Sequence, residues 1–198
     1  MSRFIESIGV LHGEIRNLAF HQKRMNETYW AFFGKENSMD LNEILNDSSF
    51  PLHGKFKCRI VYAEEVLDIQ FMPYEIRPLD SFALVENNAL DYRWKYDNRQ
   101  VFERMKKEVN EDEIIIVQNG EITDTSYSNL VFFDGENWVT PTTYLLNGTM
   151  RQSLLETKQI VEKPIQVEDL NRFETFKMIN AMMNLEESPN LSMSMIRG

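Results

Sequence analysis

The spacing of apolar residues changes along the first part of the chain, and each change predicts a different element. Residues 4–10 alternate loosely between apolar and polar side chains, which predicts a strand, and a short second strand follows near Ile15. Apolar residues then recur at helical spacing over residues 18–33, and Gly34 is expected to end that helix. A second, short helix and a turn-rich connector at Asn46–Gly54 complete this part.

Three further strand-like runs follow the connector. Residues 55–62 and 66–73 predict a hairpin with an acidic tip, and residues 82–86 predict one more strand. A short polar stretch comes next, after which the pattern changes again. The chain is therefore expected to have three parts: a small α+β domain at 1–86, a linker at 87–94 and a larger domain at 95–198.

The second half predicts a compact series of strands with one loop suited to an anion. A helix is expected from residue 98 or 99 to 109, followed by the apolar run Ile114–Val117 and the tight-turn dipeptide Asn119-Gly120. The loop Asn147-Gly148-Thr149 then opens a helix near Met150, and a helix N-terminus of this kind presents N–H groups that suit a phosphate. The remaining predicted elements are strands at 130–133, 160–164, 173–179 and 190–197, a strand that ends at Thr140-Pro141, and a short helix at 167–170.

Composition excludes several classes of function. The 198 residues carry a net charge of −10, which argues against nonspecific nucleic-acid binding, and no apolar run is long enough for a membrane span. The single cysteine, Cys58, lies in an apolar strand and reads as a small buried hydrophobe in a reducing compartment. The charged N-terminus does not look like a signal peptide, so a cytoplasmic location is expected. The methionines near the C-terminus are expected to pack, and no metal site is expected.

One string of residues carries a family resemblance. Its matches are Gly120, Ile122, Asp124, Asn129, Leu130, Thr140-Pro141, Leu146, Gly148, Thr149 and Arg151. At this spacing they resemble the fold-type IV pyridoxal-phosphate enzymes, the aminotransferase class IV family. That family includes branched-chain and D-amino acid aminotransferases and 4-amino-4-deoxychorismate lyase. The resemblance implies an α+β, two-domain D-amino acid aminotransferase-like fold, with a small N-terminal α/β domain and a larger, mixed barrel-like C-terminal domain.

The resemblance also points to a catalytic lysine. By itself, Lys95 between two aromatic residues would be read as a surface residue with a packed stem. However, Lys95 heads the segment Lys95-x-x-Asn98-Arg99, which is similar to that of the lyase-like branch, and it precedes the matched string at the family's spacing. The resemblance therefore implies that Lys95 forms the Schiff base with pyridoxal 5′-phosphate and moves protons during the reaction.

The cofactor-binding residues follow from the same match. Arg24, in the family's H-x-x-R segment with His21, would grip the phosphate, although the pair alone would be read as a solvated basic turn. Asp124 would hold the proton on the pyridine nitrogen, and Asn129 would anchor the strand or the ring oxygen. The other phosphate contacts implied are Gly148, Thr149 and Met150 at the helix start, and Asn180 and Ala181 in a late loop. Arg151 is expected to be structural.

Three positions depart from the family pattern. Asp124 stands where glutamate is usual, Met150 where many relatives have threonine, and Gly9 where a basic residue often lies on the first strand. The first function expected is a lyase that converts 4-amino-4-deoxychorismate to 4-aminobenzoate and pyruvate, for folate synthesis. The alternatives are an amino acid aminotransferase with a 2-oxo acid acceptor and a degenerate homologue without activity. The expected partners are a small-molecule amine substrate and a second copy of the chain in a homodimer.

Overall fold

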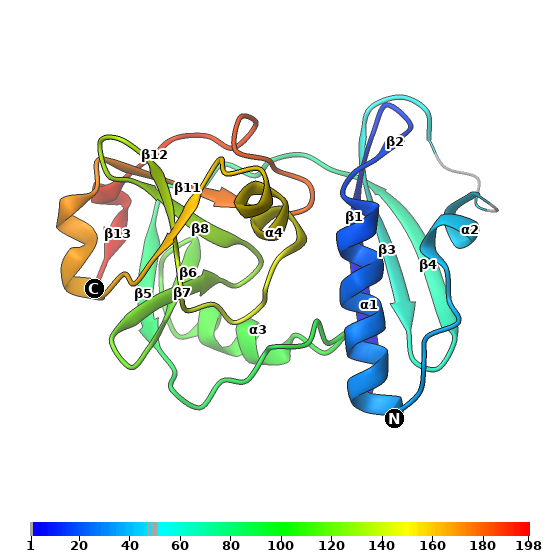
Figure 1. Ribbon diagram of the computed structural model, residues 1–198. Coiled ribbons are helices and arrows are strands. Elements are labelled where there is room, and N and C mark those ends of the chain that lie inside the picture. The colour runs from blue at the N-terminus through cyan, green and yellow to red at the C-terminus, as the bar shows by residue number, and fades with distance from the viewer. Residues whose placement is uncertain (1, 47, 49–50) are drawn as a thin grey trace. The chain divides into compact units, whose positions relative to one another are not determined.

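The computed structural model describes residues 2–46, 48 and 51–198, and these residues form two compact units (Figure 1). Unit 1 comprises residues 1–76 together with 94–98, and unit 2 comprises residues 77–93 together with 99–198. Part of the connector predicted at 46–54 lies outside the described residues. The chain therefore leaves unit 1, enters unit 2, and returns to unit 1 for five residues that include Lys95.

Unit 1 is an antiparallel sheet covered by helices. Its elements are β1 (Phe4–Leu11), β2 (Glu14–Ile15), α1 (Leu18–Phe33), α2 (Leu41–Asn46), β3 (Lys55–Tyr62) and β4 (Val66–Pro73). The sheet has the order β2-β1-β3-β4, and α1 lies against it (Figure 1). Met25 of α1 packs with apolar residues of β1 and β3 in one core cluster, which explains the helical spacing of the apolar residues. Gly34 ends α1 with a φ of 65°, a backbone conformation that glycine adopts without strain.

Unit 2 is a mixed sheet with two α-helices and two short 3-10 helices. Its strands are β5 (Phe82–Glu86), β6 (Glu113–Gln118), β7 (Glu121–Thr125), β8 (Asn129–Phe133), β9 (Trp138–Pro141), β10 (Val161–Lys163), β11 (Thr175–Ile179), β12 (Leu191–Ser192) and β13 (Ile196–Arg197). Its helices are α3 (Gln100–Lys107), α4 (Thr149–Glu156), η1 (Val167–Arg172) and η2 (Met193–Met195). The main path of the sheet is β10-β9-β8-β7-β6-β5-β13, and β11 pairs with β8 beside this path.

The order of strands in unit 2 explains the sequence pattern. Strand β6 lies between β5, which is parallel to it, and β7, which is antiparallel, and Ile114 to Val117 are all buried. A strand buried on both faces has no polar alternation, so a continuous apolar run is what it requires. Asn119 and Gly120 connect β6 to β7 with φ values of 52° and 79°, as a two-residue hairpin turn with two positive φ angles demands.

The two-unit mixed α and β architecture confirms the fold class that the sequence indicated. The boundaries, however, differ from those expected. Strand β5, expected in the small domain, pairs with β6 and so belongs to unit 2. Residues 94–98, expected at the linker and the start of the larger domain, pair with β1. The closing strand expected at 190–197 is interrupted by η2, which separates β12 from β13. Among the described residues, no helix has both the length and the hydropathy needed to cross a membrane.

Candidate functional site

In unit 1, Arg24 and His21 are held by a carboxylate from strand β1. Both lie on the face of α1 that is turned to the sheet, as their spacing of three residues predicts. Glu6 of β1, with no exposed surface, accepts hydrogen bonds from Arg24 Nε at 2.9 Å and Nη2 at 2.5 Å. The Nδ1 atom of His21 lies 2.6 Å from the same carboxylate. The solvated basic turn that the segment alone would suggest is therefore wrong, because both side chains are buried.

The three groups of this cluster fix one another's protonation. Burial alone would raise the pKa of Glu6, but the charge and hydrogen bonds of Arg24 and the hydrogen bond of His21 lower it to about 2. Burial lowers the pKa of His21, and the nearby positive charges of Arg24 and Lys95 lower it further. The hydrogen bond and charge of Glu6 raise it, but the net shift in the pKa is downward. At neutral pH Glu6 is therefore ionised, and a neutral His21 donates its Nδ1–H to it.

Lys95 lies in the short segment that pairs with the start of β1. The carbonyl of Lys95 accepts a hydrogen bond of 2.9 Å from the Ile5 N–H, and Tyr96 forms a bridge with Phe4. The rings on either side of the lysine are both anchored in unit 1, since Trp94 and Tyr96 each contact Phe32 edge-on. Lys95 is thus fixed by its backbone and its neighbours, and its charge is close enough to influence the pKa of His21.

In unit 2, Asp124 and Asn129 meet across the hairpin of β7 and β8. The two residues are directly paired, and Asn129 Nδ2 donates to Asp124 Oδ1 at 2.7 Å and to the Leu146 carbonyl at 2.9 Å. Asp124 Oδ2 accepts from the backbone N–H groups of Leu145 and Leu146, at 3.0 and 2.9 Å. The carboxylate therefore joins the hairpin to the loop before α4, as well as being a candidate to face a cofactor.

Asp124 differs from Glu6 in its charge environment. It is buried, and burial raises its pKa to about 6, although its hydrogen bonds with Leu146, Asn129 and Leu145 and the charge of Arg151 act in the opposite direction. A carboxylate offers about four acceptor positions, and three donors from the protein occupy three of them. Asp124 Oδ1 therefore keeps the capacity to accept one further donor.

Gly148 stands at the N-terminus of α4 because no side chain fits there. A Cβ atom at this position would lie 2.0 Å from Asn129 Oδ1, far inside contact distance. Thr149 and Met150 are buried in the first turn of α4, and Met150 packs with Val131 and Leu154. The methionine side chain is thus part of the core, so any cofactor contact from Met150 would come from its backbone.

Asn180 forms hydrogen bonds within the loop at residues 180–183 and to a neighbouring loop. Its backbone N–H and carbonyl both bond to Met183, its Oδ1 accepts from the Met182 N–H at 2.9 Å, and its Nδ2 donates to Ser128 Oγ at 2.9 Å. No acceptor among the described residues takes the N–H of Ala181. Of the two residues expected to contact phosphate here, Ala181 is the better placed to donate a backbone hydrogen bond, and Asn180 holds the loop to the residue before Asn129.

Arg151 has the structural role expected of it. It is almost completely buried, and its Nη2 donates to the Pro141 carbonyl at 2.9 Å and also pairs with Glu162. Its guanidinium also lies 4.5 Å from the ring centre of Tyr144. These contacts brace α4 against the end of β9.

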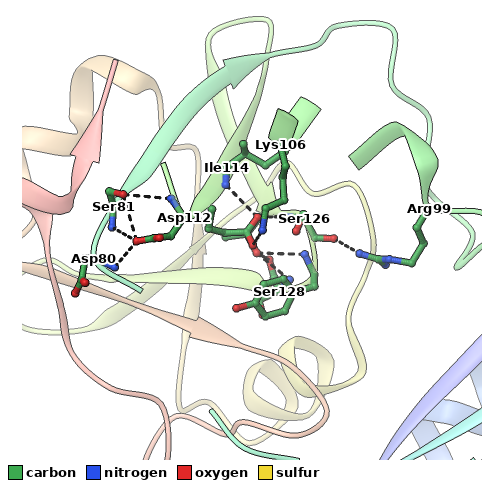
Figure 2. A network of polar contacts seen from close by, with 11 residues as sticks. Asp80, Ser81, Arg99, Lys106, Asp112, Ile114, Ser126 and Ser128 are labelled. Carbon is green, nitrogen blue, oxygen red and sulfur yellow. Dashed lines mark hydrogen bonds and ion pairs between the residues drawn. The ribbon is translucent and has the colours of Figure 1, made fainter. Parts of the chain in front are cut away.

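Sequence reasoning did not identify the residues that hold the turn between Asp124 and Asn129. Ser126 contacts two charged groups of opposite sign. Its carbonyl accepts from Arg99 Nη2 (Figure 2), and its N–H donates to Glu113 at 3.3 Å. Glu113 is fully buried and pairs with Lys106 at 2.8 Å. Glu113 begins a strongly apolar strand, and an acidic residue at such a position was the signal available in the sequence.

Within each unit, the structure gathers the residues that the sequence singled out. Arg24 and Lys95 belong to unit 1 and both act on His21. In unit 2, Asn129 contacts both Asp124 and Gly148, and Asn180 donates to Ser128, the residue before Asn129. The roles of Glu6 and Glu113, and the contact of Arg99 with Ser126, are additions from the three-dimensional contacts.

Comparisons with known proteins show what the chain as a whole is similar to. A family model described as amino-transferase class IV matches residues 70–186. An "uncharacterized protein" of Haemophilus influenzae strain Rd is 34% identical over 188 residues, which are 93% of this chain and all of that protein. A solved structure from Haemophilus somnus 129pt, named a "putative 4-amino-4-deoxychorismate lyase", has a TM-score of 0.86 at 32% identity and covers 93% of this chain and 98% of its own.

More distant structures share the fold. A "putative amino-acid aminotransferase" from Mesorhizobium loti has a TM-score of 0.79 at 20% identity, and the match covers the whole of both chains. A "hypothetical aminotransferase" from Mycobacterium tuberculosis, in its PLP-bound form, has a TM-score of 0.74 at 15% identity and covers all of this chain and 82% of its own. At these identities the likeness concerns the fold alone.

Proposed function

This chain belongs to the class IV aminotransferase family of pyridoxal-phosphate-dependent enzymes, and from that premise we propose that it is a lyase converting 4-amino-4-deoxychorismate to 4-aminobenzoate and pyruvate. The observation that carries the proposal is the likeness, at 32% identity over 93% of the chain, to the H. somnus structure named for that activity. The Lys95-x-x-Asn98-Arg99 segment, typical of the lyase-like branch, supports it.

The residues present fit the phosphate group of pyridoxal 5′-phosphate. Unit 1 supplies Arg24, whose planar guanidinium is suited to a phosphate oxygen pair. Unit 2 supplies the first turn of α4 after Gly148, where the helix dipole favours an anion, and the N–H of Ala181. Within each unit, these groups are donors that suit phosphate oxygens.

The remaining groups fit the ring and the reacting carbon. The cofactor supplies an electron sink for the negative charge that develops beside the substrate nitrogen. Lys95 would hold the cofactor and, as a free amine, remove and return the proton on the carbon that carries the substrate's amino group. Asp124, through the acceptor position that its protein partners leave on Oδ1, would keep the proton on the pyridine nitrogen. Asn129 would hold Asp124 in place.

Product formation by the cofactor-loaded protein tests the proposal directly. Purified protein is incubated with pyridoxal phosphate, desalted, and given 4-amino-4-deoxychorismate, and both 4-aminobenzoate and pyruvate are measured. We expect both products in equal amounts, and about a hundredfold or greater loss of rate in Lys95→Ala, as for removal of a general acid–base group. The visible absorbance band of lysine-bound cofactor should disappear in the same variant. A wild-type protein that retains the cofactor but makes no 4-aminobenzoate would rule out the lyase.

An amino acid aminotransferase is the second candidate function. The M. loti structure with that name covers the whole chain, so the fold is compatible with either reaction. Exchange of an amino group between an amino acid and a 2-oxo acid, without release of 4-aminobenzoate, would favour it. Failure of the wild-type protein to retain any cofactor would instead favour the degenerate homologue, in which the changes at Asp124, Met150 and Gly9 have removed binding.

We also propose that the protein forms a homodimer. Helix α1 exposes Trp30 at 61% and Phe32 at 38% of their surfaces, and exposed apolar side chains that lie together mark protein–protein contacts. Size-exclusion chromatography with light scattering should give twice the chain mass of 23.4 kDa. A monomer at micromolar concentration would contradict this proposal and leave the chemistry of the site untouched.

A further inference from the structure

The cluster of Glu6, His21 and Arg24 is a polar group set inside an apolar core. Strand β1 places Glu6 directly opposite Ile60 of β3, and Ile8 and Met25, both fully buried, belong to the surrounding core cluster. A buried ion pair of this kind is generally no more stabilising than hydrophobic residues of similar volume. The cluster therefore needs a reason other than the stability of unit 1.

Two hydrogen bonds to the Glu6 carboxylate restrain the position and orientation of the Arg24 guanidinium. Glu6 Oε1 accepts from Nε at 2.9 Å and Oε2 accepts from Nη2 at 2.5 Å, so the carboxylate meets the side edge of the guanidinium with two parallel bonds. Two bonds to one planar group fix its plane as well as its position. The edge that contains Nη1 is consequently held on the side away from Glu6.

His21 completes the restraint by holding the carboxylate itself. Its Nδ1 atom lies 2.6 Å from Glu6 Oε2, the oxygen that Arg24 Nη2 also contacts. One carboxylate oxygen therefore receives a donor from each of two neighbouring turns of α1, and Glu6 cannot rotate without losing both. The side chains that meet here are 15 and 18 residues apart in the sequence, so the strand and the helix must both be in place before the cluster forms.

We propose that Glu6 is a positioning residue for the cofactor phosphate, because it fixes the plane and direction in which Arg24 presents its outer guanidinium edge. The inference rests on the proposed function, since it assumes that Arg24 binds that phosphate. His21 supports the same geometry by holding Glu6. None of the three groups is required to react.

A purely electrostatic role for Glu6 predicts the opposite outcome. The negative charge of Glu6 opposes a phosphate, so its removal would strengthen phosphate binding if charge alone mattered. If geometry dominates, removal of the charge and displacement of the carboxylate should both weaken binding. Glu6→Gln keeps the shape and removes the charge, whereas Glu6→Asp keeps the charge and draws the carboxylate back by one methylene, so the pair separates the two effects.

The experiment compares dissociation constants for pyridoxal 5′-phosphate and for pyridoxal, which lacks the phosphate. We expect wild-type protein to prefer the phosphorylated form and Glu6→Asp and Glu6→Gln to bind it about tenfold more weakly, as for one lost hydrogen bond to a charged group. Pyridoxal binding should stay within about twofold of wild type, a change below half a kcal/mol. Ile8→Val, which removes one methylene beside the cluster, should leave both constants unchanged and is the matched control.

The outcomes distinguish this inference from the function on which it rests. A wild-type protein that binds neither compound, or binds both equally, would contradict the proposed phosphate site itself. A wild-type preference that Arg24→Gln removes but Glu6→Asp retains would overturn only the role of Glu6, as would tighter binding by Glu6→Gln or equal weakening of both compounds. If the Glu6 variants do not fold, Arg24→Lys keeps the charge without the fork, and an undiminished preference in that variant would overturn the inference.

Discussion

At the residue scale, the contact between Gly148 and Asn129 shows how closely the candidate site is packed. Gly148 has φ −64° and ψ 143°, a conformation open to any residue, so backbone strain does not explain the glycine. The Cβ of an alanine would instead lie 2.0 Å from Asn129 Oδ1. We expect Gly148→Ala to lower the free energy of unfolding by about 1–3 kcal/mol, the usual cost of overpacking, as measured by urea denaturation.

A double-mutant cycle identifies the cause of that loss. If the clash with Asn129 is responsible, Gly148→Ala should cost much less in an Asn129→Ala background, where the clashing atom is absent. Gly34→Ala is a useful comparison, because a Cβ there would meet nothing within 4 Å and its cost would come only from the positive φ of 65°. Equal costs of Gly148→Ala in both backgrounds would show that Asn129 is not the obstacle.

The sequence singled out candidate site residues more readily than the residues that hold them in place. Asp124, Asn129 and Gly148 belong to one contiguous string, and the structure brings them into contact. Glu6 could not be assigned, because its role depends on a strand and a helix that meet across 15 or more residues. The fate of Met150 likewise depended on the core around it, since its side chain packs with residues of β8 and β11.

At the element scale, local pattern was a good guide wherever an element is determined by its own residues. The hairpin of β3 and β4 and the helix α1 lie where alternation and helical spacing predict them. Strand β5 was predicted at the right residues but in the wrong unit. Its place in the sheet depends on its pairing with β6, and the residues of β5 alone do not indicate that partner. The last strand was expected to be continuous, yet η2 interrupts it, and Ser192 caps that turn by accepting from the Ser194 N–H.

The turn between β7 and β8 is an element whose shape depends on α3. Arg99, at the start of α3, donates to the Ser126 carbonyl (Figure 2). Its guanidinium also lies 5.0 Å from the ring centre of Phe102. A lysine side chain lacks the planar guanidinium, so it cannot make the hydrogen bond to Ser126 and the contact with the Phe102 ring at the same time. We expect Arg99→Lys to cost about 1–2 kcal/mol of stability, and to speed hydrogen exchange of the Ser126 amide as the turn loosens.

Arg93→Lys is the matched control for this substitution. Arg93 pairs with Asp91 at 2.7 Å, but both side chains are largely exposed, and an exposed ion pair contributes little. Its replacement should change stability by less than about 0.5 kcal/mol. If Arg99→Lys behaves like Arg93→Lys and the Ser126 amide exchanges at its original rate, α3 does not determine the shape of the turn.

At the scale of the whole molecule, the two units contain buried carboxylates that respond to acid in opposite ways. The pKa of Glu6 in unit 1 falls from its ordinary 4.5 to about 2, because Arg24 and His21 outweigh the effect of burial. The pKa of Asp124 in unit 2 rises from 3.8 to about 6, because burial outweighs its hydrogen bonds. Each shift implies a dependence of stability on pH, with opposite sign.

The direction of each pH dependence follows from the protonation state that the folded protein favours. The fold favours ionised Glu6, so its contribution is complete above pH 4.5 and is lost as the pH falls toward 2. The fold favours protonated Asp124, so its contribution is complete below pH 3.8 and is lost as the pH rises through 6. Each of these two pKa changes corresponds to about 3 kcal/mol between its two limits.

Replacing each carboxylate by its amide should therefore change the pH profile in opposite directions. Relative to Asp124→Asn, the wild-type free energy of unfolding should rise by about 2 kcal/mol between pH 7 and pH 4, because the buried aspartate takes up its proton in that range. Relative to Glu6→Gln, wild type should show no change between pH 7 and about pH 5.5, and should lose stability as the pH falls through 4.5 toward 2. Urea denaturation at several pH values, on cofactor-free protein, measures both differences. A parallel response of the two variants would mean that Asp124 is not shielded from water as its burial in unit 2 requires, and a candidate partner for the pyridine nitrogen would then have to be an ordinary solvated aspartate.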